Sequence, residues 1–377
     1  MEDPAGGFPG LTDIHAHPAL NAFLWGRSLE RHYWTGGSFD PLASLSDFQM
    51  LRRGDVRILW SSLHVPEREF FRCLPIRLAA RLFRGGRMLL RHDYWECLEA
   101  QQAMLEAQVA ASGDFEVARS NADLDRVLAD GRRAIVHTVE GGHVLGAGLG
   151  PDDVDGRLSR IDRLAEWGVA MLTIAHLFPN ELAGHADGIP AGLRTFPCPL
   201  DPGVDLARGL TATGLAVLER MVERGILPDA THCAPPARHE IYERVAGRIP
   251  VIASHVGVAN LKPVPYNLDR ADVAAIAASG GVVGVIFMPY WLRPTDPGEG
   301  LEAIWATMAT VSEWSGGWGH VAIGTDFDGF TDPADDCDSA ARLPRVREML
   351  EGKGLARAEV EAVLGGNARR VLRAAWR

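Results

Sequence analysis

Thr12-Asp13-Ile14-His15-Ala16-His17-Pro18, near the N-terminus, is the stretch from which both the fold and the site can be worked out. One alanine separates the two histidines, so on an extended strand both imidazoles point to the same face. Neutral imidazole is the commonest metal ligand in proteins. In a chain with 13 histidines, two of them can also fall two residues apart by chance. The stretch therefore predicts half of a metal site, which the rest of the chain has to complete.

Short apolar runs recur along the chain and alternate with segments of helical pattern. Continuous apolar runs are typical of parallel strands that are buried on both faces. Eight such strands alternating with helices predict an α/β fold whose sheet closes into a (β/α)8 TIM barrel. The runs that follow the His15/His17 strand are residues 56–62, 134–140, 168–176, 225–232, 250–255, 281–287 and 321–326.

Six of these eight strands end in a histidine or a carboxylate. In (β/α)8 barrels the active site lies at the C-terminal ends of the strands. Any one of these residues can be structural, but buried ionisable groups are costly unless they are paired or bound to a metal. Six at equivalent positions therefore favour a metal-dependent hydrolase. The residues are His15 with His17, Glu140, His176, His232, His255 and Asp326.

This set has more ligands than one ion can use, because a catalytic zinc usually takes about three protein ligands. We therefore expect two metal ions, bridged by Glu140, since no lysine ends a strand. Zinc is expected first, and manganese, iron or cobalt suit the same donors. One ion is expected among His15, His17, Glu140 and Asp326, and the other among Glu140, His232 and His255.

The same residues suggest a reaction. Two adjacent metals can acidify a bridging water and polarise the carbonyl that it attacks. Asp326 is then expected to take the proton from that water and pass it to the leaving group. His176 is expected to donate to the developing oxyanion, or else to be a hydrogen-bonded residue of the barrel rim.

The composition narrows the class of protein. An apolar fraction of 47% and a charged fraction of 23% are ordinary for a globular chain. A length of 377 residues fits one barrel domain over residues 1–377 that carries an insertion. The net charge of -11 argues against a nucleic acid partner, and no apolar run reaches membrane-spanning length. We expect a small-molecule substrate, and a homodimer is compatible with a barrel of this size.

The cysteines and the N-terminus bear on location. The five cysteines are widely spaced, odd in number and without a CxxC pair, which predicts reduced thiols and no disulfide framework. The first residues lack the basic and apolar regions of a secretory signal. Together these features predict a cytoplasmic protein.

Residues 66–93 form the expected insertion. Six arginines from Arg72 to Arg91 recur every three to five positions among apolar residues, which predicts basic amphipathic helices broken at Gly85-Gly86. Such a segment can be a lid, a subunit contact or a surface for anionic lipid. We favour a lid or a subunit contact.

From about Asp13 to the last helix, the chain resembles the membrane (renal) dipeptidase family of the amidohydrolase superfamily. That resemblance implies a binuclear zinc barrel that hydrolyses dipeptides, often with a C-terminal D-residue. It also implies a bridging Glu140 and a carbonyl-binding His176. The matching motifs are Val139-Glu140-Gly141-Gly142-His143, Met171–His176, Gly209-Leu210-Thr211 with Gly214, Asp229–His232, Ser254-His255, Gly324–Gly329, and Leu364–Asn367 with Arg370.

Two departures from the family pattern concern the site. His17 stands where the first family motif ends in Asp, which keeps a ligand and removes a negative charge. Tyr266-Asn267 stands where the family has an Arg before the Asn, and that Arg holds the free carboxylate of the dipeptide. A phenol donates one hydrogen bond and cannot replace a bidentate charged pair. Tyr266 and Asn267 are the expected substrate contacts, with Lys262 as a further cation nearby.

Three functions follow from these observations. The first is hydrolysis of a dipeptide or dipeptide-like amide. The second keeps the metals and changes the bond, to an N-acyl amino acid, a cyclic amide or a lactone; a phosphoester is a further alternative. The third is a non-catalytic barrel that binds a metal or a protein partner, which the complete set of ligands disfavours.

Overall fold

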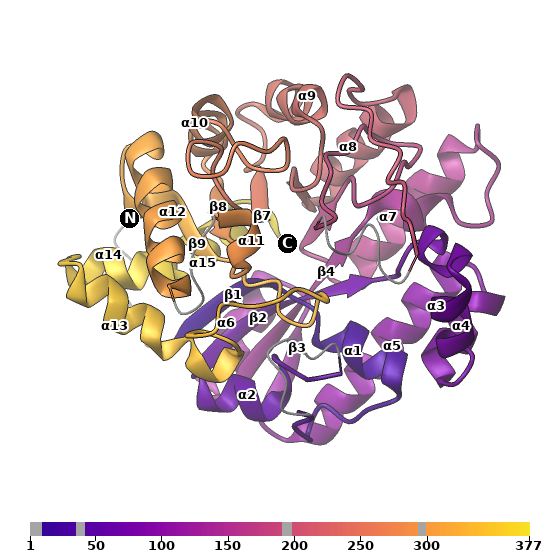
Figure 1. Cartoon of the computed structure of the whole chain (residues 1–377). Coiled ribbons are helices and arrows are strands. Elements are labelled where there is room, and N and C mark those ends of the chain that lie inside the picture. The colour runs from indigo at the N-terminus through magenta and orange to yellow at the C-terminus, as the bar shows by residue number, and fades with distance from the viewer. Residues whose placement is uncertain (1–9, 35–41, 191–197, 293–298) are drawn as a thin grey trace.

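The computed structural model describes residues 10–34, 42–190, 198–292 and 299–377 (Figure 1). Its central feature is a sheet of parallel strands in the order β1-β2-β4-β5-β6-β7-β8-β9, with β3 paired to β4 beside this path. The strands are β1 Leu11–Ala16, β2 Val56–His64, β3 Phe115–Ala118, β4 Arg133–Glu140, β5 Met171–Thr173, β6 Leu227–Asp229, β7 Ile252–Val256, β8 Val282–Val285 and β9 Val321–Ile323.

The sheet closes where the first strand meets the residues that follow the last one. The Asp326 amide donates to the His15 carbonyl over 2.9 Å, and the His17 amide donates to the Phe327 carbonyl over 2.7 Å. Burial along the path strands is nearly complete, as expected for apolar runs covered on both faces. The predicted (β/α)8 barrel is therefore confirmed.

One strand outside the eight-strand path, β3, was not predicted. It pairs with Arg133–Val136, the first half of β4, whereas β5 pairs with Thr138–Glu140 on the second half. Phe115 stacks on Phe48 with ring centroids 4.3 Å apart, which anchors β3 to the helix that precedes β2. With only four residues, β3 gives too short an alternating pattern to be separated from a loop by periodicity.

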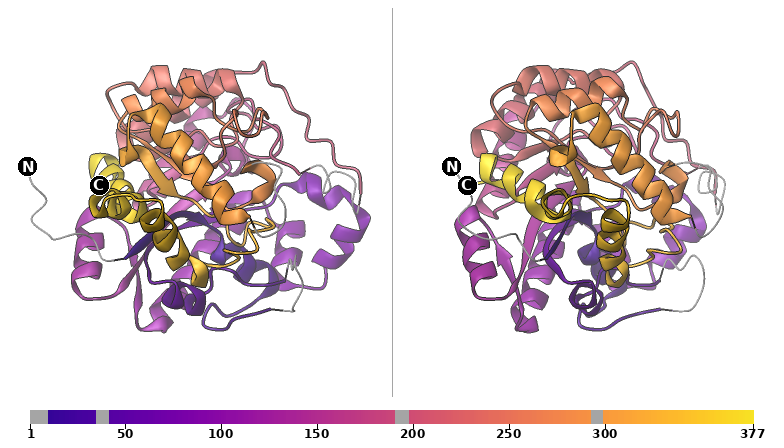
Figure 2. Two further views of the ribbon diagram at one scale, coloured as in Figure 1. Left: turned by 60° about the vertical axis from the view of Figure 1, so that its left-hand side comes forward. Right: turned by 90° about the vertical axis from the view of Figure 1, so that its left-hand side faces the viewer.

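Helices surround the strands (Figures 1 and 2). The C-terminal helix packs at the barrel end opposite the site, where Asn367 donates to the Val321 carbonyl and the Trp376 indole donates to the Gly168 carbonyl. The α-helices are α1 Pro18–Trp25, α2 Phe48–Arg53, α3 Leu74–Ala80, α4 Arg84–Arg91, α5 Tyr94–Ser112, α6 Asn121–Ala129, α7 Val154–Glu166, α8 Ala212–Arg224, α9 Pro235–Val245, α10 Arg270–Ala278, α11 Pro289–Leu292, α12 Gly300–Ser315, α13 Pro344–Gly352, α14 Arg357–Glu361 and α15 Asn367–Ala375.

The insertion forms a short 3-10 helix, Arg68–Arg72, followed by α3 and α4. The break between the two α-helices lies at residues 81–83, so the predicted break at Gly85-Gly86 is wrong. Both glycines are buried in the first turn of α4, and a Cβ on Gly85 would lie 2.2 Å from the Phe23 carbonyl oxygen. Gly85 therefore allows α4 to pack closely on α1, and Gly86 allows it to pack closely on Ala80 at the end of α3.

A disulfide joins Cys73, just before α3, to Cys198, which follows β5 in the chain. The prediction of five reduced cysteines is therefore wrong for this pair, while Cys97, Cys233 and Cys337 are free and buried. The two partners are 125 residues apart, so no local spacing could indicate the pairing. The cytoplasmic location rested partly on the cysteine pattern and loses that support, because disulfides persist mainly in oxidising compartments.

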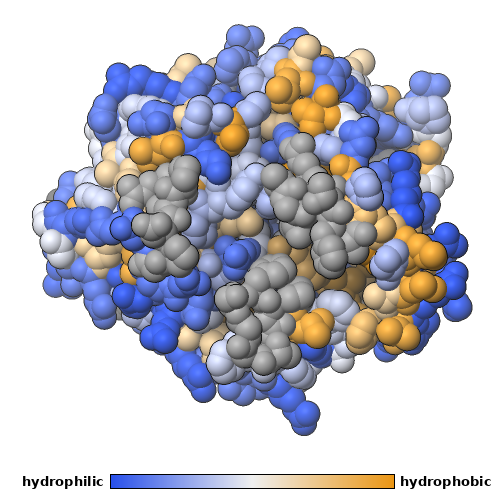
Figure 3. Space-filling view, viewed as in Figure 1, coloured by the Kyte–Doolittle hydropathy of each residue, from blue (hydrophilic) through white to orange (hydrophobic). Residues whose placement is uncertain are grey.

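The surface of the insertion is partly apolar. Leu74, Leu78 and Leu82 are 62%, 49% and 74% exposed. Figure 3 shows hydrophobic residues gathered on the side where α3 and α4 lie. Among the described helices, none has both the length and the apolar character needed to cross a bilayer.

Candidate active site

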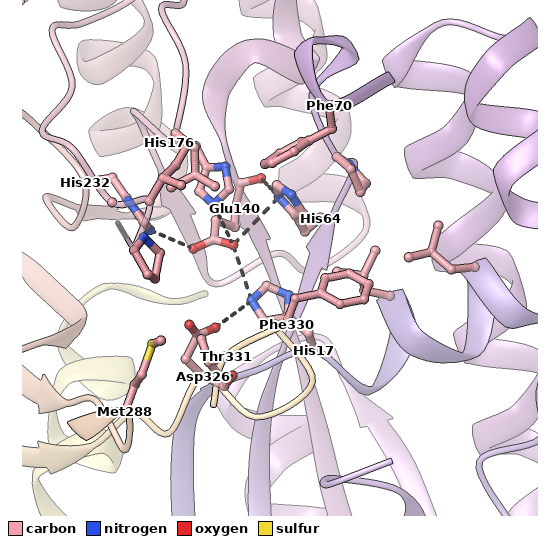
Figure 4. Close-up of a pocket in the computed structure, with 18 of the residues that line it drawn as sticks. His17, His64, Phe70, Glu140, His176, His232, Met288, Asp326, Phe330 and Thr331 are labelled. Carbon is pink, nitrogen blue, oxygen red and sulfur yellow. Dashed lines mark hydrogen bonds and ion pairs between the residues drawn. The ribbon is translucent and has the colours of Figure 1, made fainter. Parts of the chain in front are cut away.

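The predicted polar residues meet at one end of the barrel, around the carboxylate of Glu140 (Figure 4). Oε1 of Glu140 lies 3.3 Å from Nε2 of His15, 3.5 Å from Nε2 of His232 and 3.4 Å from Nε2 of His255. Oε2 lies 3.3 Å from Nε2 of His17 and 3.4 Å from Nε2 of His176. The two carboxylate oxygens thus face two different groups of imidazoles.

Asp326 lies on the His17 side of this centre. Its Oδ1 is 3.2 Å from Nε2 of His17 and 3.8 Å from Nε2 of His15. Across the centre, Nε2 of His232 and Nε2 of His255 are 3.1 Å apart. The six expected ligands therefore come together, although Nε2 of His15 lies nearer to Oε1 of Glu140, at 3.3 Å, than to Oδ1 of Asp326, at 3.8 Å.

Two buried aspartates, Asp13 and Asp229, hold neighbouring strands together by hydrogen bonds close to the site histidines. Asp13 accepts from the Thr325 hydroxyl over 2.6 Å and from the His15 amide over 3.1 Å, which ties β1 to the end of β9. Asp229 accepts from the hydroxyls of Thr173 and Ser254, both over 2.6 Å. Each aspartate lies two or three residues before a site histidine, so its hydrogen bonds fix where that histidine emerges.

The backbone also directs two of the ligands. His232 and Asp326 adopt left-handed conformations, with φ of 64° and 60°. Non-glycine residues rarely adopt this region, and where they do the surrounding structure holds them there, often at functional sites. Behind Asp326 the chain approaches closely, because a Cβ on Gly329 would lie 2.3 Å from Oδ1 of Asp326. Nothing in the residue types at 232 and 326 alone predicts these conformations.

The charges of the centre are strongly coupled. Burial favours the neutral form of Glu140, but the surrounding histidines His176, His15 and His17 outweigh it and hold the pKa of Glu140 well below its ordinary value. Burial likewise opposes protonation of His17, yet the charges of Glu140 and Asp326 raise the pKa of His17 to about 10. The raised pKa of His17 favours its protonated form, whose positive charge compensates the neighbouring buried carboxylates.

These residues fit a metal centre. Oε1 of Glu140 is buried and accepts no hydrogen bond among the described residues, although three imidazole nitrogens surround it. Imidazole nitrogens with carboxylate oxygens are the donor set of zinc and of neighbouring transition metals. Among the residues that the structure describes, three groups of donor atoms lie close enough together to hold an ion: His15, Glu140 and His255; His15, His17 and Asp326; and His64, Glu140 and His176.

Two further residues, His64 and Glu67, lie in the site and were not predicted from the sequence. His64 ends β2, with its Nδ1 3.1 Å from the Glu140 carbonyl oxygen and 3.7 Å from Oε2 of Glu140. Burial lowers the pKa of His64 to about 3, so its imidazole is neutral. Glu67, from the start of the insertion, places Oε1 2.6 Å from Nδ1 of His176. His64 carried the same signal as the other strand ends, whereas Glu67 follows its strand within a loop and carried none.

The expected substrate contacts are placed differently. Tyr266 lines the cavity above the metal centre, but its hydroxyl donates to the His255 carbonyl over 2.6 Å. The side chain of Asn267 donates to the Trp291 and Lys262 carbonyls and accepts from the Gly257 amide. The Asn267 side chain thus holds the loop in place and is not among the cavity-lining residues, and its expected role in substrate binding stays a prediction. The Lys262 ammonium lies 4.3 Å from the centre of the Tyr290 ring and also does not line the cavity.

The cavity holds about 340 Å³ and opens from the metal centre towards the insertion. His17, Glu140, His176, His232, His255 and Asp326 line its inner end. Its volume falls at the lower end of the range for small-molecule sites, about 300–1,000 Å³. Of the predicted ligands, only His15 lies behind this lining.

Sequence comparisons place this architecture among known proteins. Residues 31–376 match the model of the family described as membrane dipeptidase, peptidase family M19. A protein from the pqqA 5′ region of Klebsiella pneumoniae is 28% identical over 291 residues, which are 75% of this chain and 98% of that protein. Dipeptidase tcpJ of Claviceps purpurea is 24% identical over 282 residues, 74% of this chain and 59% of that protein.

Solved structures share the fold. A metallopeptidase from Rhodobacter sphaeroides, solved with a phosphinate mimic of the dipeptide L-Ala-D-Ala, has a TM-score of 0.76 at 19% identity. It covers 97% of this chain and 99% of its own. The probable dipeptidase PvdM from Pseudomonas aeruginosa has a TM-score of 0.75 at 19% identity, covering 97% of this chain and 95% of its own. With the family match spanning nearly the whole chain, the protein belongs to the membrane dipeptidase family of metallopeptidases.

Proposed function

We propose that this metallopeptidase is a binuclear enzyme that cleaves the amide bond of dipeptides, including those with a C-terminal D-residue. The observation that carries the proposal is the position of Glu140: its Oε2 lies 3.3 Å from Nε2 of His17, and its Oε1 lies 3.5 Å from Nε2 of His232 and 3.4 Å from Nε2 of His255. Nε2 of His15 lies 3.3 Å from Oε1 but also 3.0 Å from Nε2 of His17, so His15 can serve an ion on the His17 side. A carboxylate placed in this way can bridge two ions. His15, His17 and Asp326 would hold one ion, His232 and His255 the other, and zinc is the first expected metal.

When bound, the ions would supply an acidified water and Lewis acidity towards the scissile carbonyl. Asp326 places Oδ1 beside His17 at the inner end of the cavity, where its other carboxylate oxygen can accept the proton of the attacking water. The same carboxyl can then return that proton to the leaving amine. Asp326 therefore acts first as general base and then as general acid.

His176 acts on the carbonyl oxygen. Burial disfavours the charged form of His176, but the carboxylates of Glu67 and Glu140 outweigh burial and raise the pKa of His176. Glu67 binds Nδ1, so Nε2 is the nitrogen that faces the centre and can donate to the oxyanion. A donor fixed in place before the reaction stabilises the charge without reorganisation.

Metal content and turnover test this proposal together. Protein depleted of metal with a chelator is reloaded with Zn²⁺, Mn²⁺ or Co²⁺ and assayed on L-Ala-D-Ala, Gly-D-Ala and all-L dipeptides. We expect about two ions per chain by elemental analysis and turnover that depends on loading. Asp326→Asn is expected to retain metal and lose about 10²–10⁴-fold in kcat, and the exposed Asp335→Asn is the matched control. One ion per chain at saturation would contradict the binuclear centre, and full activity of Asp326→Asn would contradict its role.

A second function changes the bond and keeps the metals. Among the described cavity-lining residues there is no lysine or arginine to pair with the carboxylate of a dipeptide. An N-acyl amino acid, a cyclic amide or a lactone is therefore the alternative substrate, and a panel of these compounds separates the two functions. A cytoplasmic location and a homodimer stay predictions, which fractionation and sedimentation can check.

A further inference from the structure

The cavity changes character with distance from the metal centre. Its inner end carries the histidines and carboxylates described above. Its outer walls are apolar and come from α1, the insertion and the segment after β5, represented by Leu24, Trp25, Phe70, Ile76, Phe83 and Ile189. A ligand whose reacting bond lies at the metals therefore extends along hydrocarbon and aromatic surfaces.

This apolar wall is a packed part of the molecule. Trp25 of α1 meets Phe83 edge to face with ring centroids 4.6 Å apart, and Phe70 meets Phe178 in the same way at 5.1 Å. The disulfide at Cys73 joins the start of α3 to Cys198. Such a wall is formed before the ligand arrives, so little binding energy is lost in ordering it.

The arginines of the insertion face elsewhere. Arg68, Arg77, Arg81, Arg87 and Arg91 line a separate surface groove, and none of them lines the cavity. Within the described part of the cavity wall, the ionisable side chains all belong to the inner end. Burying a charged group of the ligand against the apolar outer walls would be unfavourable, because no partner compensates its lost hydration.

From these observations we infer that the substrate is an amide that carries a bulky, uncharged apolar group, aromatic or aliphatic, on one side of the scissile bond. This inference rests on the proposed function, because the amide is placed by the metal centre. The apolar group lies between α1 and α3 and supplies the affinity that an arginine would supply to a small charged dipeptide. We therefore expect kcat/KM to increase with the apolar surface area of this group of the substrate.

Two substrate series test the inference on the metal-loaded full chain. In L-Xaa-D-Ala and in Gly-D-Xaa, Xaa is Ala, 2-aminobutyrate, norvaline, norleucine and 2-aminooctanoate, so only methylenes are added on either side of the bond. We expect kcat/KM to rise about three- to fourfold per methylene in one series until the cavity is filled. The corresponding Phe dipeptide is expected to exceed Ala by at least tenfold.

The possible outcomes distinguish failure of the inferred apolar specificity from failure of the proposed amide hydrolysis. Equal turnover along both series, or a decline with chain length, overturns the inference and leaves the proposed function standing. Loss of turnover on converting the C-terminal carboxylate to an amide also overturns it, because that result means that a charge dominates recognition. No turnover of any member by protein that holds two metals means that the proposed function itself has failed.

Variants in α3 test whether the apolar outer wall of the cavity causes the rise of kcat/KM with side-chain length. Ile76→Ser makes one wall position polar and is expected to lower the norleucine-to-alanine ratio of kcat/KM by fivefold or more. Leu78→Ser, on the same helix and 49% exposed, is outside the cavity lining and is expected to leave the ratio unchanged. Ile76→Ala repeats the test if Ile76→Ser folds poorly, as judged by its melting curve. If Ile76→Ser, Ile76→Ala and Leu78→Ser all show the same norleucine-to-alanine ratio of kcat/KM, this part of the cavity wall does not determine the specificity.

Discussion

Nδ1 of His176 lies 2.6 Å from Oε1 of Glu67, and both side chains are almost fully buried. The Leu177 amide donates to the same oxygen over 3.2 Å, so Glu67 fixes both the ring and the backbone of this loop. Glu67 belongs to the start of the insertion, which therefore reaches the active site as well as the cavity wall. Such outer hydrogen bonds orient functional histidines and select their tautomer.

Glu67→Gln is expected to lower kcat about 10–100-fold, the range found when the partner that orients a site histidine is changed. The amide oxygen can still accept from Nδ1 of His176, but as a neutral and weaker acceptor. The amide keeps the shape of the side chain and removes the charge that holds the His176 proton. Metal content should be unchanged, and KM should change less than kcat. Glu69→Gln, a partly exposed neighbour that pairs with Arg72, serves as the control. An unchanged kcat in Glu67→Gln would mean that His176 does not depend on this contact.

Tyr266→Phe separates two roles of this phenol. Its hydroxyl donates to the buried His255 carbonyl, so we expect the free energy of unfolding to fall by about 1–3 kcal/mol when the donor is lost. The ring remains on the cavity wall, so KM for an uncharged amide substrate should stay within about twofold. Urea unfolding and steady-state kinetics provide the two measurements. A tenfold rise in KM confined to substrates with a free carboxylate would instead show that Tyr266 binds that carboxylate.

The cysteines can be counted chemically. Burial raises the pKa of Cys97 and of Cys233 to about 12, so these thiols stay protonated and react slowly in the folded protein. A disulfide-exchange reagent is expected to find almost no thiol in the native protein, three after unfolding and five after unfolding with a reductant. Five thiols without a reductant would contradict the Cys73–Cys198 bond.

Removal of this disulfide should also weaken the fold. In the double variant Cys73→Ser, Cys198→Ser, we expect the free energy of unfolding to fall by about 2–4 kcal/mol, because the bond closes a long loop in the unfolded chain. Cys97→Ser, which changes a free buried thiol, is the control for the loss of sulfur alone. Equal stability of the double variant and the parent would show that the bond contributes little.

The pair of Glu106 and His137 predicts a dependence of stability on pH. Nε2 of His137 lies 3.1 Å from Oε1 of Glu106. This hydrogen bond lowers the pKa of Glu106 below its ordinary 4.5. Partial burial opposes the shift, and nearby positive charge adds to it. The unfolded chain therefore binds the proton more readily. The contribution is fully present above about pH 4.5 and is lost as the pH falls through the lower pKa of the folded state.

Glu106→Gln should therefore lower the free energy of unfolding by about 1–2 kcal/mol at pH 7, with a smaller difference from the parent at pH 3. Glu99→Gln, an exposed residue of the same helix, is the control and should follow the parent at each pH. Urea unfolding at several pH values measures the difference. If the difference in free energy of unfolding between the parent and Glu106→Gln does not become smaller towards low pH, Glu106 is not the group that causes the loss of stability in acid.

The barrel and most of its site could be predicted because their signals are local. Residues such as His232 and His255 each end a short apolar run, and the barrel brings all such ends together whatever their separation in sequence. His64 obeys the same rule, but the predicted strand stopped at residue 62 and β2 continues two residues further. His64 was therefore missed because the predicted strand ended two residues too early.

The remaining features depend on contacts between distant segments. Glu67 acquires its role only when it meets His176, 109 residues later, and Cys73 acquires its role by meeting Cys198. The family pattern made Tyr266 and Asn267 candidates for substrate binding, but position alone could not show that backbone carbonyls already use their donors. Pairing of donors and acceptors is decided by the folded structure.

The shared edge of β4 has a consequence for how the protein opens. One edge of this strand is bonded to β2 along nearly its whole length, and the other is bonded first to β3 and then to β5. Its amides therefore exchange hydrogen with solvent only when a large part of the sheet separates. Glu140 stands at the end of this strand, so its carboxylate is carried by a part of the sheet that is paired on both edges. Peripheral helices can fray while the centre of the site keeps its geometry.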